Sequence, residues 1–199
     1  MNYLAHQYLS FQNEEIQLGN LYGEIVRGKD FTNYPKGIQL GIKLHRSIDT
    51  FTDQHEVVKR SSQLFHKNYG KYSPVIIDVF YDYFLIRNWN KYSEIPFEKF
   101  IEDAYALFRK NFDTFPPRLQ YIIKYMLKMD WFRTYQTKEG VKKTLEGISQ
   151  RAKFENNIED AVNELNIYEE QLDNDFNEFF PEIINYCKKY IETETNLFI

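Results

Sequence analysis

The hydrophobic residues of this chain recur mostly three or four positions apart, which is the spacing of amphipathic helices. Alternation of polar and apolar residues, which is typical of strands, never lasts more than a few positions. The pattern therefore predicts an all-α fold. Helices are expected over about residues 2–11, 18–27, 36–51, 54–69, 75–89, 97–112, 118–135, 140–151 and 157–193.

Glycine, proline and short polar residues mark several of the expected helix ends. Gly28 stands where a glycine commonly ends a helix, and Pro35 stands where a proline commonly begins one, with a loop expected between them. Thr52 or Asp53 is expected to cap the helix that follows. The chain has only 8 glycines and 6 prolines, which favours long helices. We therefore expect a single domain of about eight or nine helices over residues 1–199.

Composition narrows the class of protein further. With 43% hydrophobic and 18% aromatic residues, the chain of 199 residues can build one packed core. A net charge of −4 does not favour nucleic acid as a partner, and no apolar run approaches the roughly 20 residues that span a bilayer. The N-terminal segment lacks the basic start of a signal peptide, so a cytoplasmic protein is expected. The single cysteine, Cys187, excludes an intrachain disulfide and is expected to be buried and inert.

Two acids interrupt the most apolar of the predicted helices, in the stretch "VIIDVFYDYFLIRNW". Asp78 and Asp82 stand four positions apart and therefore on one face of that helix. Two buried carboxylates on adjacent turns repel each other, so they require protons or a positive partner, and a divalent cation is the compact one. The alternative is that this face is the single solvated stripe of the helix, with the acids in water or paired with Arg or Lys.

A second pair stands in the stretch "GIKLHRSIDTFTDQH", where His45 and Asp49 are again four positions apart on a largely apolar face. The same spacing lets two residues of one helix bind a metal ion, and imidazole with carboxylate suits Mn, Fe or Zn. The alternative is a core histidine with satisfied hydrogen bonds. His6 and Glu24 join the set only if a metal site exists; otherwise they are a core histidine and an exposed helix acid. Helices lined by His and Asp predict hydrolysis assisted by a metal ion.

Four motifs in order carry a resemblance to a known family: "MNYLAHQYLS", "GNLYGEIVRG", "YPKGIQLGIKLHRSIDTFTDQHEVVKRS" and "IDVFYDYFLIRNW". Together they resemble the acyl carrier protein phosphodiesterase family, also called acyl carrier protein hydrolase, a distant relative of the HD-domain phosphohydrolases. The resemblance implies an HD-like helical fold. It also implies Mn-dependent hydrolysis of the phosphodiester that joins 4′-phosphopantetheine to a serine of holo-acyl carrier protein, with Mg, Fe or Zn as alternative ions.

The resemblance also implies roles for individual residues. The inner metal ligands are expected to be His6, His45, Asp49 and Asp78, with Glu24 and Asp82 as further ligands or as catalytic bases that orient water. Arg46 is expected either to bind the phosphate during catalysis or to be a surface arginine, and Asn20 either to orient the phosphate or to cap a helix. Asp53 and Arg60 are further candidates for substrate binding.

This chain departs from the family pattern at two positions. Glu24 stands where the family usually has Asp, and Tyr83 stands where it usually has His. The extra methylene of Glu24 moves its carboxylate by about 1.5 Å, which a ligand absorbs more easily than a general base does. A ring nitrogen is lost at position 83. If that nitrogen binds metal or protonates the leaving group, this chain is weaker, altered in substrate or inactive.

The partner implied by the resemblance is an acidic protein, so a locally basic rim is expected near the site. The expected rim consists of Lys36, Lys43, Arg46, Lys59, Arg60, Lys67 and Lys71, each of which has ordinary solvated surface as its alternative. Two other functions stay open: hydrolysis of a nucleotide or another small phosphoester, and a non-catalytic module that binds a carrier protein.

Overall fold

A computed structural model of the chain describes residues 1–28, 31–154 and 156–196, and these residues form helices and connecting loops without any strand. Nine of the helices are six residues or longer, which confirms the prediction of an all-α fold with eight or nine helices; α6 and α9 are single turns. The helices are α1 (Tyr3–Tyr8), α2 (Glu14–Gly23), α3 (Lys36–Gln54), α4 (Glu56–Tyr69), α5 (Ser73–Arg87), α6 (Trp89–Tyr92), α7 (Phe97–Lys110), α8 (Pro117–Met129), α9 (Trp131–Thr134), α10 (Lys138–Ser149) and α11 (Ala161–Asn196), with short 3-10 turns at Gly70–Tyr72, Phe112–Thr114 and Ile158–Asp160.

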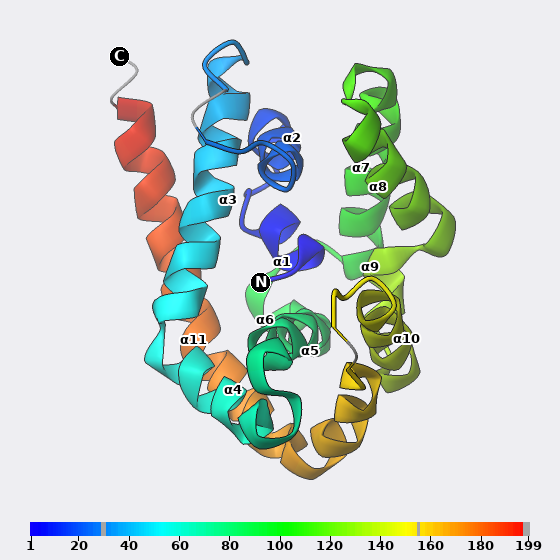
Figure 1. Ribbon diagram of the computed structural model, residues 1–199. Helices are drawn as coiled ribbons and strands as arrows, with labels where there is room; N and C mark the ends of the chain where they lie inside the picture. The colour runs from blue at the N-terminus through cyan, green and yellow to red at the C-terminus, as the bar shows by residue number, and fades with distance from the viewer. Residues whose placement is uncertain (29–30, 155, 197–199) are drawn as a thin grey trace.

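The helices form two sides joined by a common base (Figure 1). Helices α2 and α3 stand on one side, α7 and α8 stand on the other, and the short helix α1 lies between them. Helix α5 lies below α1, and the long helix α11 packs in turn along α5, α4 and α3. Most residues of α5 are buried, as its almost continuous apolar sequence predicts.

Two glycines allow α2 and α3 to pack at very short range. A β-carbon on Gly19 would lie 2.3 Å from the carbonyl oxygen of Ile38 and 2.7 Å from the Cα atom of Gly41. Any side chain at either glycine would therefore force the two helices apart. This close crossing sets the positions of the polar residues that α2 and α3 direct toward α1.

Three predicted helix boundaries are wrong. Asn13 caps α2 by accepting a hydrogen bond from the Ile16 amide, so the helix begins before residue 18 and ends before Gly28, which lies in the loop with a positive φ of 62°. Helix α3 continues through Thr52 and Asp53 to Gln54, so neither residue caps α4. Asp130 adopts a left-handed conformation that divides the predicted helix at 118–135 into α8 and α9. Part of the predicted loop before Pro35 lies outside the described residues.

Two predictions from composition can be compared with the structure. Cys187 is fully buried on α11, and burial raises the pKa of its thiol, as expected of an inert cysteine. Across the described parts of the chain, every helix is too short or too polar to cross a membrane.

Candidate metal centre

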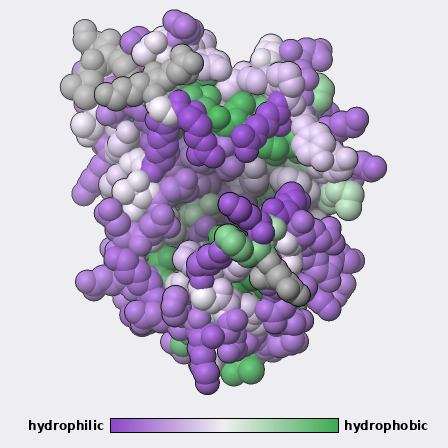
Figure 2. Space-filling model, in the orientation of Figure 1, coloured by the Kyte–Doolittle hydropathy of each residue, from purple (hydrophilic) through white to green (hydrophobic). Residues whose placement is uncertain are grey.

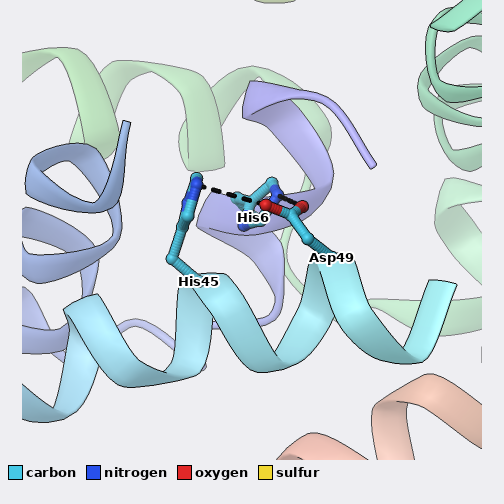
Figure 3. A group of neighbouring side chains, drawn as sticks. All are labelled: His6, His45 and Asp49. Atoms are coloured by element: carbon cyan, nitrogen blue, oxygen red, sulfur yellow. Dashed lines mark hydrogen bonds and ion pairs between the residues drawn. The ribbon is translucent and has the colours of Figure 1, made fainter. Parts of the chain in front are cut away.

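Two helices place three of the predicted ligands together. His45 and Asp49 lie one turn apart on α3, and His6 faces both of them from α1 (Figure 3). One ligand atom from each of the three residues lies within 4.8 Å of the others, which is a spacing that one metal ion can bridge. His6 and His45 are buried, whereas the Asp49 side chain is 45% exposed and opens the group toward solvent.

The buried side chain of Asn20 orients both histidine rings. Its Oδ1 atom accepts hydrogen bonds from Nδ1 of His6 at 2.9 Å and from Nδ1 of His45 at 3.2 Å. The orientation of the amide follows from its other end, where Nδ2 donates to the hydroxyl of Ser10 and to the His6 carbonyl. Because a carbonyl oxygen only accepts, both Nδ1 atoms carry hydrogen, and in the neutral form of either ring the lone pair is on Nε2.

These lone pairs are directed at a carboxylate. Nε2 of His6 lies 3.1 Å from Oδ1 of Asp49, and Nε2 of His45 lies 3.4 Å from Oδ2. The two rings stack with their centroids 4.3 Å apart. Electron pairs on nitrogen and on carboxylate oxygen repel each other at such distances unless a proton or a cation lies between them.

The charge states of His45 and Asp49 are the ones that metal ions require. Burial, followed by repulsion from His6, lowers the pKa of His45 to about 3, so its ring is neutral at pH 7. Burial alone raises the pKa of Asp49, but the hydrogen bond and charge of His6 outweigh it and lower the pKa to about 2. A neutral imidazole and an ionised carboxylate are the forms that bind metal, so this donor set fits a divalent transition ion.

His45 and Asp49 line a pocket of about 300 Å³ beside Met1, whereas His6 lies behind them and does not line it. Figure 2 shows that this face of the molecule is hollowed near its centre and that hydrophilic residues surround much of the hollow. Of the predicted site residues, Glu24, Asp53 and Asp78 line the pocket with His45 and Asp49. Its other lining residues are Met1, Gly23 and Arg27.

Glu24 is the pocket carboxylate with the properties of a proton carrier. It follows the last residue of α2, and its Oε1 atom lies 3.9 Å from Nε2 of His45. Burial is the main cause that raises the pKa of Glu24, and Tyr3, which interacts with it, partly offsets the rise. A carboxyl group whose protonated form is favoured by burial is suited to accept and return a proton.

The two acids of α5 have positive partners other than a metal ion. Asp82 is fully buried and accepts hydrogen bonds from the backbone amides of Leu4 at 3.1 Å and Ala5 at 3.3 Å, at the start of α1. Asp78 accepts a hydrogen bond from the amino group of Met1 at 2.8 Å. Asp82 therefore satisfies amide groups that a helix start leaves unpaired, and Asp78 forms an ion pair with the amino group of Met1.

This arrangement changes the roles predicted for these two acids. The predicted role of Asp82 as a ligand or a catalytic base is not supported, because both its oxygens face α1 and it does not line the pocket. Burial raises the pKa of Asp82 to about 7. It acts instead by holding the helix that carries His6. Asp78 lines the pocket but lies outside the group of three ligands.

The predicted phosphate-binding arginines are engaged elsewhere. Arg46 donates to the carbonyl oxygens of Gly28 at 2.7 Å and Val26 at 3.1 Å, so it holds the loop after α2 rather than facing the pocket. Arg60 pairs with Asp175 and Glu178 of α11 and lies outside the pocket. The capping role considered for Asn20 is also excluded, because Asn13 caps α2.

Arg27 is the charged side chain of the pocket that sequence reasoning missed. It is exposed and lines the pocket. In the sequence it lies between Val26 and Gly28, whose carbonyl oxygens accept hydrogen bonds from Arg46. The sequence pattern predicted Arg27 to be the last residue of a helix. In the structure α2 ends at Gly23, so Arg27 lies in the loop that follows. The only signal in the sequence was Gly28, one residue later.

Gly23 makes room for the imidazole ring of His45. A β-carbon on Gly23 would lie 2.4 Å from Cγ of His45, which is far inside van der Waals contact. Gly23→Ala is therefore expected to displace the ring and to weaken the binding of Mn at least tenfold, as measured by isothermal titration. Gly147→Ala is the matched control, because its added carbon would meet only the end of Arg151, at 3.6 Å. Equal Mn affinity in both variants would contradict this role.

Tyr83, which stands where the family resemblance led us to expect a histidine, does not line the pocket. Its hydroxyl donates to Glu169 of α11 at 3.1 Å, beside Arg87. The ring packs against Phe84 in the core. We therefore expect that Tyr83→His changes kcat less than about threefold in a hydrolase assay, although it lowers the melting temperature because the buried ring is lost. A large gain in kcat would instead make position 83 part of the chemistry.

The fold and this site define a class: an all-helical protein that groups two oriented histidines and an aspartate at the edge of a pocket. The chain belongs to the acyl carrier protein phosphodiesterase family, because the sequence model of the family described as acyl carrier protein phosphodiesterase matches residues 1–183. The resemblance drawn from the four motifs is therefore confirmed.

Individual relatives match over nearly their whole length. Proteins named acyl carrier protein phosphodiesterase from Salmonella paratyphi A and Enterobacter sp. are each 29% identical to this chain, over 185 and 189 residues. These matches cover 92% and 94% of this chain, and 96% and 98% of the relatives. A relative of the same name from Klebsiella pneumoniae is also 29% identical. No solved structure shows significant similarity to this chain.

Proposed function

We propose that this chain hydrolyses the phosphodiester between 4′-phosphopantetheine and the serine of holo-acyl carrier protein, using a divalent metal ion held by His6, His45 and Asp49. The single observation that carries the proposal is Asn20, whose one oxygen directs two Nε2 lone pairs toward the same carboxylate. Membership in the family supports the substrate. We propose Mn as the ion, with Mg, Fe or Zn as alternatives, because the donors are imidazole and carboxylate.

In this proposal each residue of the pocket has a separate task. When bound, the ion supplies Lewis acidity that activates water and polarises a phosphoryl oxygen. The guanidinium of Arg27 binds the non-bridging phosphate oxygens. The planar guanidinium can donate two parallel hydrogen bonds to two such oxygens. The carboxylate of Glu24 takes the proton from the attacking water. As the oxygen of water bonds to phosphorus, the bond from phosphorus to the serine oxygen breaks, and that oxygen takes up the proton that Glu24 accepted from the water.

The test follows the mass of the carrier protein. Chain stripped of metal by a chelator is incubated with purified bacterial holo-acyl carrier protein, with and without Mn. We expect the carrier to lose the mass of phosphopantetheine only when Mn is present, and His45→Ala to prevent the loss. An unchanged carrier beside cleavage of bis(p-nitrophenyl) phosphate would indicate a hydrolase of small phosphoesters. Binding of the carrier without turnover of either substrate would indicate a non-catalytic module.

A further inference from the structure

Helix α8 exposes a row of large apolar side chains to solvent. Tyr121, Tyr125 and Met129 are 64%, 41% and 59% exposed, and their spacing of four residues puts them on one face. The two tyrosine rings lie against each other, with centroids 4.7 Å apart. Among the described residues, only Phe154 and Ile167 are other large apolar side chains with comparable exposure. A contiguous apolar row of this kind is typical of an interaction surface.

The same helix is basic, although the whole chain has a net charge of −4. Arg118, Lys124 and Lys128 are exposed, and no acidic residue occurs between Pro117 and Met129. None of the three cations forms an ion pair with another described residue. We use the name α8 face for this surface, which consists of Arg118, Tyr121, Lys124, Tyr125, Lys128 and Met129.

Three of the seven cations in the rim that was predicted from the sequence are already engaged by other groups. Lys43 pairs with Glu194, and Arg60 pairs with Asp175 and Glu178. Arg46 is held by backbone carbonyl groups. Cations that already have partners contribute less to the attraction of an acidic protein.

The α8 face lies next to the candidate metal centre. Tyr3 of α1 packs against Trp131, directly after α8, with ring centroids 5.6 Å apart, and Tyr3 also interacts with Glu24 of the pocket. Burial raises the pKa of the Tyr3 hydroxyl, and the positive charges of Arg151 and Arg118 slightly offset that rise. In Figure 1, α8 faces α2 and α3 across the position of α1. A protein on the α8 face would therefore lie beside the pocket.

We propose that the α8 face is the docking surface for the carrier protein and that it binds an acidic, partly apolar face of that protein. This inference rests on the proposed function for the identity of the occupant. Charge complementarity selects the occupant, because unpaired cations favour acidic partners and the net negative charge of the rest of the chain repels them. The tyrosine rings and Met129 provide apolar contact area at the centre of the surface, with the cations around them.

The test measures binding and turnover separately. Affinity for holo-acyl carrier protein is measured by isothermal titration with the full chain in the presence of a chelator, so that no turnover occurs. Lys124→Glu with Lys128→Glu is expected to weaken binding at least tenfold at low salt, and Tyr121→Ala with Tyr125→Ala about tenfold. With Mn restored, both double variants are expected to raise KM for the carrier and to leave the cleavage of bis(p-nitrophenyl) phosphate unchanged.

The matched control is Lys59→Glu with Lys67→Glu on α4. Both lysines are exposed, the change of charge is the same, and Lys67, like Lys128, lies in the last turn of its helix. The control is expected to bind within about twofold of the unchanged chain, apart from the effect of net charge on long-range attraction. Equal weakening by the control and the α8 variant would overturn the assignment.

Two further outcomes separate this proposal from the proposed function. Carrier binding that depends on the α8 face but brings no release of phosphopantetheine would overturn the proposed function and support the docking surface. Release of phosphopantetheine with the same KM in all variants would support the proposed function and overturn the docking surface. A dimer in light scattering that Tyr121→Ala with Tyr125→Ala converts to a monomer would assign the face to a second copy of this chain and overturn carrier docking.

Discussion

Replacement of Asp49 by alanine is expected to abolish metal binding and to lower hydrolase activity by about 10³-fold or more. Asp49 is the carboxylate that faces both Nε2 atoms, at 3.1 and 3.4 Å, so its loss leaves only two nitrogen ligands and no anionic one. A loss of about 4 kcal/mol of transition-state stabilisation corresponds to a factor of 10³ in rate. The measurements are Mn binding by isothermal titration and the mass of the carrier protein after incubation.

Stability is expected to change much less than activity in this variant. The Asp49 side chain is 45% exposed, so its interactions with the two histidines are screened by water. We expect the free energy of unfolding, measured without metal, to change by less than about 1 kcal/mol. Asp53→Asn is the matched control, because Asp53 lies one turn further along α3 and lines the pocket outside the group of three. It should keep Mn binding; retained Mn binding in Asp49→Ala would refute the proposed ligand set.

Replacement of Asn20 by alanine is expected to weaken metal binding by about 10- to 100-fold, although Asn20 is not itself a proposed ligand. Its Oδ1 atom is the common acceptor for two Nδ1–H groups, and without it either ring can rotate or change tautomer. The variant also leaves buried donors unsatisfied, which costs about 1–3 kcal/mol of stability. The two measurements are Mn affinity and the midpoint of urea unfolding.

The variant Asn20→Asp distinguishes the effect of Asn20 on the orientation of the histidine rings from its effect on the stability of the fold. An aspartate keeps an oxygen for both Nδ1–H groups, so Mn affinity should stay close to that of the unchanged chain. Its second oxygen faces the carbonyl of His6, where the Asn20 amide donates at 3.2 Å, so stability should fall as it does in Asn20→Ala. If both variants lose Mn affinity equally, stability rather than the hydrogen bonds to the rings explains the effect.

The candidate site could be predicted from the sequence wherever its residues share one helix. His45 and Asp49 follow from a spacing of four, because that spacing brings side chains together in any α-helix. The association of His6 with them came from the family resemblance, since no local pattern shows that α1 faces α3. The role of Asn20 was missed because it depends on two bonds to residues 14 and 25 positions away.

The acids of α5 illustrate the opposite case. Their spacing correctly placed Asp78 and Asp82 on one face and required a positive partner, but several partners satisfy that requirement. The amide groups of α1 and the amino group of Met1 occupy this position in the structure, and the contacts span 77 or 78 residues. Electrostatics alone does not distinguish a metal ion from a helix start.

The hydrophobic pattern by itself determined the all-α fold and the approximate helices, because helical periodicity and proline placement depend on neighbours within one or two turns. Only the tertiary structure decided which polar residues meet. The glycines of α2 bring it close to α3, the end of α2 at Gly23 releases Arg27, and α8 leaves its basic and aromatic face uncovered. Such contacts join segments far apart in the chain, so their geometry is set by how whole helices pack rather than by any local run of residues.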